Sequence, residues 1–154
     1  DMPGLTVLTA SIPIANVLAD APSIRLIVTG GIVRKQERSM TGQIAVNTFR
    51  SFHVDKAFIG IGGIHSEAGL TEYNLEDALV KQALIGCAGR VVVVADSSKL
   101  QQVCFATVAD LSVVDTLITD AAAPPEVIAE LTDQGIEVII APTNTSGPKA
   151  STDS

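Results

Sequence analysis

Aromatic residues and cysteines are scarce in this chain, and each shortage excludes a class of protein. Aromatic residues make up 3% of the 154 residues and tryptophan is absent, so a core of ordinary size must consist of valine, isoleucine, leucine and alanine. The two cysteines, Cys87 and Cys104, are too few for a disulfide scaffold and lack the spacing of a zinc site. We expect both to be small buried hydrophobic residues of a cytoplasmic protein.

Long apolar runs and clustered basic groups are also missing. No stretch approaches the roughly 20 apolar residues of a membrane-spanning helix, and Asp1-Met2-Pro3-Gly4 does not resemble the basic start of a signal peptide. The net charge is −7, and the ten lysine and arginine residues are scattered along the chain. Because duplex DNA is held mainly by such residues on its phosphates, we expect neither a membrane partner nor DNA binding by this chain alone.

Strands alternate with helices along the chain. Apolar runs predict strands over 5–9, 24–29, 56–61, 90–95, 116–119 and 136–140, and helical periodicity predicts helices over 12–18, 41–52, 74–87 and 124–134. This alternation predicts one α/β domain over 1–141, a three-layer, Rossmann-like arrangement with a mostly parallel sheet and helices on both faces. Residues 142–154 have no apolar periodicity, which predicts a disordered tail.

The segment from Asp55 to Ile64 is the strongest functional signal. An apolar strand ends here in the glycines Gly60, Gly62 and Gly63 and continues into a polar loop that contains His65. Residues without a Cβ allow a ligand, or another stretch of backbone, to approach main-chain N–H groups closely. A ligand crevice and a tight strand-to-loop turn are both compatible with this pattern.

Other predicted strand ends carry hydroxyl, glycine and charged residues at the edge where open α/β sheets bind ligands. These residues are Thr9, Ser11, Gly30, Gly31, Arg34, Asp96 and Lys99. The carboxylate of Asp96 can accept hydrogen bonds from sugar hydroxyls, and the ammonium of Lys99 can bind a phosphate as a point charge. Asp96 could instead cap the turn 97–100. The pattern is typical of a site for a polar, anionic ligand.

The predicted helix 74–87 adds two charged candidates. Asn74 is a good N-cap, and Asp77 places negative charge in the first turn. Lys81 lies four residues after Asp77, a spacing that suits either an exposed ion pair or a site residue. Just before this helix, Tyr73 could cover a bound sugar or fill the core.

Catalytic signatures are absent from the sequence. No Gly-x-Ser-x-Gly segment presents a nucleophile, and nothing in the spacing places serine, histidine and aspartate together. The glycines from Gly60 to Gly63 lack the third glycine of a dinucleotide-binding fingerprint. We therefore expect no enzyme, no cofactor and no metal site.

Taken together, these segments resemble the effector-sensing domain of the DeoR family of bacterial transcriptional regulators. The resemblance runs from about Leu5 to Ile140 and rests on a spaced combination of motifs. The motifs are the glycine-rich run after Asp55, Glu76-Asp77-Ala78 with Lys81, Ala95-Asp96-Ser97-Ser98-Lys99, Leu5–Thr9 with Ser11, Thr29-Gly30-Gly31 with Arg34, and Thr119-Asp120.

The resemblance implies a fold similar to that of ribose-5-phosphate isomerase and a role in binding rather than catalysis. Sensors of this family bind a phosphorylated sugar or a related metabolite, and the ligand changes the conformation or assembly of what we expect to be a homo-oligomer. A separate N-terminal helix-turn-helix domain binds DNA. The residues expected to line the ligand site are Thr9, Ser11, Gly30, Gly31, Arg34, Gly60, Gly62, Gly63, His65, Asp77, Lys81, Asp96 and Lys99.

Three departures from the family pattern accompany the resemblance. A helix-turn-helix is absent, the family's first strand with its Gly-Ser/Thr-Thr phosphate loop is not found ahead of Leu5, and Leu100-Gln101-Gln102 replaces a common Phe-Gly-Arg. Two alternatives stay open, a sugar-phosphate isomerase-like enzyme of the same fold and an oligomerisation module with little ligand binding. The isomerase segments Asp-Gly-Ala-Asp and Lys-Gly-Gly-Gly do not occur in the chain.

Overall fold

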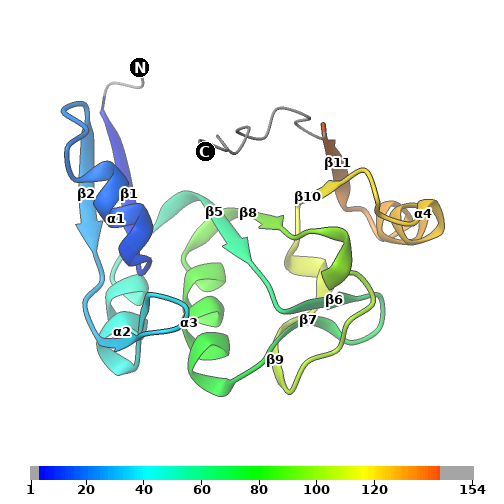
Figure 1. The fold of residues 1–154 in the computed structure, drawn as a ribbon, viewed down its shortest axis with the longest axis horizontal. Helices are drawn as coiled ribbons and strands as arrows, with labels where there is room; N and C mark the ends of the chain where they lie inside the picture. Colours follow the sequence, from blue (N-terminus) through cyan, green and yellow to red (C-terminus); the bar gives the residue numbers. More distant parts are fainter. Residues whose placement is uncertain (1–3, 143–154) are drawn as a thin grey trace, which may run out of the picture.

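The computed structural model describes residues 4–142, in which short helices pack on parallel strands (Figure 1). The strands are β1 (Leu5–Thr9), β2 (Ile24–Val28), β3 (Ile32–Arg34), β4 (Ser39–Thr41), β5 (Val54–Gly60), β6 (Gly63–His65), β7 (Gly69–Glu72), β8 (Ala88–Val94), β9 (Ala106–Ala109), β10 (Thr116–Asp120) and β11 (Glu137–Ala141). The helices are α1 (Ile12–Leu18), α2 (Gln43–Arg50), α3 (Leu75–Gly86) and α4 (Pro125–Asp133), with 3₁₀ turns η1 (Ser97–Lys99) and η2 (Leu111–Val113).

The central sheet is parallel and has the strand order β11-β10-β8-β5. Each crossover leads to the neighbouring strand in the same direction, so right-handed connections place α3, η2 and α4 on one face. That face carries Ala57, Val93 and Leu117, which are at most 2% exposed and share one core with Leu131 of α4. The predicted α/β class with a mostly parallel sheet is confirmed.

A second, smaller core joins α2 and α3 to the unit formed by β1 and β2. Ala45 and Phe49 of α2 are buried with Val80 and Cys87 at α3, and Leu8 of β1 packs against them. β1 and β2 form a separate two-stranded parallel sheet, and no residue of α1 is buried. A two-stranded sheet is marginally stable by itself, so this unit depends on its contacts with α2 and α3.

The antiparallel parts of the fold have no counterpart among the predicted elements. β3 pairs with β4, and β6, β7 and β9 form a three-stranded sheet. Strands of three or four residues are too short to show a clear alternation of apolar and polar residues. The predicted helix 41–52 is wrong at its start, because Thr41 pairs with Ile32 and α2 begins after Gly42, whose φ is 87°.

The other predicted helices and strands are confirmed to within two residues at each end. Cys87 is buried as expected, whereas Cys104 is only half-buried, since it lies in the loop before β9. Almost all of the predicted tail 142–154 lies outside the described residues. None of the helices in residues 4–142 is long and apolar enough to span a membrane.

Leu117→Ala tests the assignment of the main core. Leu117 is 0% exposed at the centre of the sheet, so its truncation leaves a cavity, and we expect the free energy of unfolding to fall by about 2–5 kcal/mol. Urea denaturation followed by circular dichroism measures this change. Phe105→Ala removes a side chain that is 89% exposed and should change stability by less than about 0.5 kcal/mol. Equal losses in the two variants would contradict the assigned core.

Candidate functional site

Several predicted ligand residues meet at the junction of β7 and α3. Three consecutive residues at this junction, Glu72, Tyr73 and Asn74, contact three different side chains, two on α3 and one in the turn after β8. Their partners are the predicted site residues Lys81, Lys99 and Asp77, respectively. The junction therefore connects segments that the sequence presents as separate motifs.

Glu72 is the buried centre of this junction, with an exposed fraction of 5%. Its Oε1 atom accepts a hydrogen bond from the Gly62 N–H at 3.0 Å and pairs with the ammonium of Lys81. Its Oε2 atom accepts from the Tyr73 N–H at 3.2 Å. A buried carboxylate is stable only when it is paired and hydrogen-bonded, so Glu72 ties the glycine-rich loop to α3. The alternative of an exposed pair between Asp77 and Lys81 is excluded, because Lys81 turns to Glu72.

Two of the predicted glycines lie in close contact with other residues of the protein. A Cβ on Gly63 would lie 2.4 Å from the carbonyl oxygen of Gln102, and a Cβ on Gly62 would lie 3.1 Å from the carboxylate of Glu72. Gly60 is exposed and has open space where a Cβ would be. The missing side chains of Gly62 and Gly63 thus allow other residues of the protein to pack against them, while the space at Gly60 leaves room for a ligand.

His65 has a structural contact in the turn between β6 and β7. Its Nδ1 atom accepts hydrogen bonds from the N–H groups of Glu67 at 3.1 Å and Ala68 at 3.3 Å. The acceptor nitrogen of the imidazole is therefore used to close the turn.

Thr9 and Ser11 use their oxygen atoms to shape the loop between β1 and α1. Thr9 Oγ1 accepts from the Ser11 N–H at 3.0 Å, and Ser11 Oγ accepts from the Ile14 N–H at 3.4 Å as the N-cap of α1. Thr9 is buried, whereas Ser11 is partly exposed, so the Ser11 hydroxyl keeps a proton that can be donated to a ligand.

Gly30 and Gly31 provide the backbone freedom that brings β3 against α2. Their φ angles are 74° and 118°, a region that favours glycine. A Cβ on Gly31 would lie 2.4 Å from the carbonyl oxygen of Thr41. This predicted pair therefore has a clear conformational function in the fold.

Arg34 and Asp77 form a second charged cluster beside α3. Arg34 donates hydrogen bonds to Asp77 Oδ2 at 2.9 Å and to Glu37 Oε1 at 3.1 Å. Asn74 caps α3 as predicted, since its Oδ1 atom accepts from the Asp77 N–H at 2.9 Å, and its amide donates to Asp77 Oδ2 at 2.7 Å. The charges of Arg34 and Asp77 are thus neutralised within the protein.

A hollow of about 410 Å³ lies beside this cluster. It is lined by Ile32, Arg34, Thr41, Gly42, Asn74 and Glu76. Gly42 is the N-cap of α2 and provides no side-chain hydrogen bond, so the first N–H groups of α2 lack a side-chain cap. Together with the guanidinium of Arg34, these N–H groups can bind an acceptor atom of a polar ligand.

The turn after β8 carries Asp96 and Lys99, and its backbone N–H groups donate hydrogen bonds to acceptors within the protein. Asp96 Oδ1 accepts from the Ser98 N–H at 2.9 Å, which confirms the capping alternative. The Ser97 N–H donates to Asp120 Oδ2 at 2.6 Å, and the Lys99 N–H donates to the Asp96 carbonyl at 3.0 Å. The N–H groups of this turn therefore have partners already, and the side chain of Lys99 is the group that can bind an anion.

Asp120 supports the site but is missing from the predicted set. It ends β10 and accepts hydrogen bonds from the N–H groups of Ser97 and Ala122, which lower its pKa. In the same way, hydrogen bonds from Ser98 lower the pKa of Asp96. The signal for Asp120 in the sequence is its place directly after the predicted strand 116–119, the position that Asp96 occupies after its own strand.

Lys99 and Tyr73 meet across two loops at the strand ends. The ammonium of Lys99 donates to the phenol oxygen at 3.3 Å and lies 5.4 Å from the ring centroid. This hydrogen bond raises the pKa of Lys99. Tyr73 is 63% exposed, which excludes the alternative that it fills the core. Within residues 4–142, Lys99 has no carboxylate within 4.0 Å, whereas Arg34 and Lys81 are both paired.

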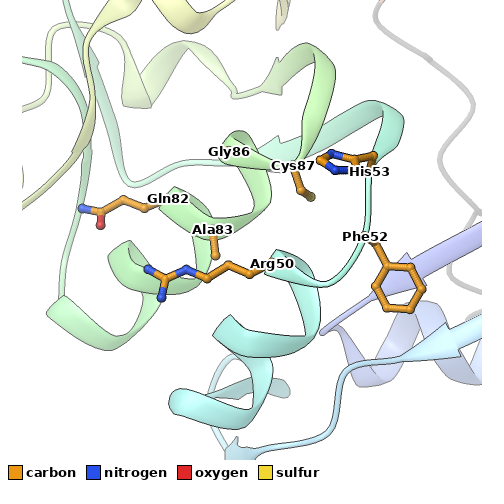
Figure 2. Close-up of a pocket in the computed structure, with 7 residues that line it drawn as sticks. All are labelled: Arg50, Phe52, His53, Gln82, Ala83, Gly86 and Cys87. Carbon is orange, nitrogen blue, oxygen red and sulfur yellow. The ribbon is translucent and has the colours of Figure 1, made fainter.

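Another hollow, of about 300 Å³, contains none of the predicted ligand residues. It is lined by Arg50, Phe52, His53, Gln82, Ala83, Gly86 and Cys87, between the ends of α2 and α3 (Figure 2). The Val54 N–H donates to the Cys87 carbonyl here, so this hollow is at the amino ends of β5 and β8. Burial raises the pKa of the Cys87 thiol, which makes it a weak nucleophile. Because open α/β sheets bind ligands at the opposite edge, we do not assign the site here.

The groups at the strand ends suit binding of a small polar molecule. Hydroxyls, carboxylates and an ammonium lie beyond the carboxyl ends of parallel strands, and the guanidinium of Arg34 lies on the antiparallel strand β3. No cluster of three histidine, cysteine or acidic side chains in residues 4–142 could hold a metal. This architecture defines the class of α/β ligand-binding domains.

The chain belongs to the family of DeoR C terminal sensor domains, whose model matches residues 1–121. It is 40% identical to the HTH-type transcriptional repressor GlcR of Bacillus subtilis over 136 residues, 88% of this chain and 52% of that protein. It is 31% identical to the HTH-type transcriptional regulator GolR of Listeria innocua, with 89% of this chain and 54% of that protein covered. It is 30% identical to the glycerol-3-phosphate regulon repressor of Escherichia coli, with 87% and 53% covered.

These matches confirm the family resemblance seen in the sequence. The chain spans about half the length of the curated relatives it matches. Because the family is one of sensor domains and the relatives are named as repressors and regulators, the domain is regulatory rather than catalytic.

Lys81→Met tests the buried ion pair. Loss of the ammonium leaves the carboxylate of Glu72 buried without its counter-charge, so we expect the free energy of unfolding to fall by about 1–3 kcal/mol in urea denaturation. Lys56→Met is the matched control, because Lys56 is exposed on β5 and has no ion pair within residues 4–142. The double variant Glu72→Gln/Lys81→Met should recover stability relative to Lys81→Met. A loss in Lys81→Met no larger than in Lys56→Met would rule out the assigned contribution.

Asp120→Asn tests the anchor of the turn after β8 through its pH dependence. The folded-state pKa of Asp120 is lowered, so its carboxylate contributes stability above the unfolded-state pKa of about 3.9, and this contribution disappears as the pH falls through the folded-state value. We expect the variant to have a lower melting temperature than the wild type at pH 7, with the difference shrinking towards pH 2. Asp55→Asn, exposed and without a side-chain hydrogen bond in the described chain, is the control. A difference that stays constant with pH would contradict the assignment.

Proposed function

We propose that this domain binds a phosphorylated sugar or a related anionic metabolite beyond the carboxyl ends of β5, β8 and β10. One observation carries the proposal: Lys99 presents an ammonium at the strand ends, and no carboxylate in residues 4–142 lies within 4.0 Å of it. A phosphate would bind this ammonium through a charge-assisted hydrogen bond. One relative is named the glycerol-3-phosphate regulon repressor, which supports a phosphorylated small molecule as the ligand class.

We place the body of the ligand between this ammonium and Gly60. Gly60 pairs with Val94 in the register of β5 and β8, so the open space at its Cβ position lies beside the start of the turn 96–99. Asp96 is exposed there and can accept from sugar hydroxyls. Arg34 lines the hollow beside the start of α2, together with Asn74.

For the whole protein, we propose a cytoplasmic homo-oligomer whose helix-turn-helix domain binds DNA. The ligand would alter DNA binding by preferring one conformation or assembly over another, since only differential affinity can shift such an equilibrium. The relatives named HTH-type regulators support this arrangement. We also propose that the family's first strand and its Gly-Ser/Thr-Thr loop add to the sheet between β1 and β5, which belong to separate sheets in the described residues.

A thermal-shift screen of the wild type and Lys99→Ala tests the ligand class. The probes are glucose 6-phosphate, ribose 5-phosphate and glycerol 3-phosphate, with glucose, ribose and glycerol as unphosphorylated controls. A ligand at ~100 times its dissociation constant stabilises a protein by roughly 2.7 kcal/mol, which raises the melting temperature visibly. We expect a phosphorylated probe to do so and its parent not to. Lys99→Ala should bind that probe at least about tenfold more weakly, a loss of about 1.4 kcal/mol.

Lys56→Ala removes an exposed lysine from β5 and serves as the control for a general effect of charge. Unchanged affinity in Lys99→Ala would remove Lys99 from the site. If no phosphorylated compound stabilised the wild-type chain, the proposed ligand class would be wrong for this chain.

A further inference from the structure

We propose that Tyr73 contacts the ligand directly and makes the site prefer a cyclic sugar phosphate over an acyclic one. This inference rests on the proposed function and adds to it the residue that distinguishes the shape of the ligand.

The ring of Tyr73 is exposed although its backbone is firmly held. Its exposed fraction is 63%. The Tyr73 N–H donates to the buried carboxylate of Glu72 at 3.2 Å, and the next residue, Asn74, caps α3. The side chain therefore projects from a rigid junction rather than from a free loop. A preorganised aromatic ring binds a ligand at a smaller cost in conformational entropy than a mobile one.

The ring also lies beside the group that we assign to the anion. The ammonium of Lys99 is 3.3 Å from the phenol oxygen and 5.4 Å from the ring centroid. The turn that carries Lys99 is itself fixed, because Asp96 and Asp120 accept hydrogen bonds from its N–H groups. A phosphate on Lys99 consequently brings the rest of the ligand within reach of the ring.

The chemistry of the ring favours one shape of ligand. An aromatic side chain offers a flat apolar surface with a polar tip, and a sugar ring has a face of C–H groups that covers such a surface. An open-chain phosphate such as glycerol 3-phosphate has no comparable face. It should bind through Lys99 alone and gain little from Tyr73.

The composition of the chain allows contact between a ligand and Tyr73 to be measured by fluorescence. Tyr73 is its only tyrosine and tryptophan is absent, so the tyrosine emission reports on this ring alone. We expect glucose 6-phosphate or ribose 5-phosphate to change this emission with the same dissociation constant that calorimetric titration gives. Saturable binding of such a cyclic probe without any change in emission would overturn the proposed contact.

Variants separate the ring from its hydroxyl and from the ammonium. By calorimetric titration, Tyr73→Ala should weaken the cyclic probe at least fivefold and change glycerol 3-phosphate less than twofold, and Tyr73→Phe should stay within twofold for both. Lys99→Ala should weaken cyclic and acyclic probes alike. Phe58→Ala, which removes an aromatic side chain of matching 65% exposure on β5, should change neither. Urea midpoints of all variants verify that each one is folded.

The outcomes distinguish this inference from the proposed function. If the wild type binds a cyclic sugar phosphate and Tyr73→Ala binds it equally well, Tyr73 is not a contact and the proposed function stands. A wild-type preference for glycerol 3-phosphate over both cyclic probes would likewise overturn this inference alone. Absence of binding by every phosphorylated probe would overturn both.

Discussion

The carboxylate of Glu72 is the constraint on which the arrangement of the strand-end loops depends. It is 5% exposed, accepts hydrogen bonds from the backbone of Gly62 and Tyr73, and pairs with Lys81. A charge taken out of water must be matched by hydrogen bonds and an opposite charge, so these three partners cannot move independently of it. The loop after β5, the start of α3 and the exposed ring at their junction therefore keep a fixed relation.

Most of the charged side chains near the strand ends form ion pairs or hydrogen bonds within the protein. Arg34 pairs with Asp77 beside α3, and hydrogen bonds from backbone N–H groups to Asp96 and Asp120 hold the turn after β8. Lys99 has no ion pair in residues 4–142, and its ammonium donates a hydrogen bond to the phenol oxygen of Tyr73. A site in which the supporting charges are already satisfied is preorganised, so a ligand can bind there without first breaking strong ion pairs.

The sequence predicts the fold better than it predicts the contacts of the site. The parallel strands, α3 with its Asn74 cap and the strand-end position of Asp96 follow from local patterns, and the structure confirms them. The partner of Lys81 is not predicted, because Glu72 lies on the preceding strand and is nine residues away. Arg34 and Asp77 are 43 residues apart, a separation that no periodicity reveals.

The sequence by itself determined the α/β class, the order of the main elements and the set of polar residues at the strand ends, because each depends on neighbours within a few positions of the chain. The family resemblance, confirmed by the matches, likewise followed from motifs and their spacing. Only the tertiary structure decided that Gly63 faces the Gln102 backbone, that Tyr73 is exposed, and that Lys99 lies against the phenol of Tyr73. Steric approach and charge pairing depend on distances in space, and the packing of segments far apart in the chain sets those distances.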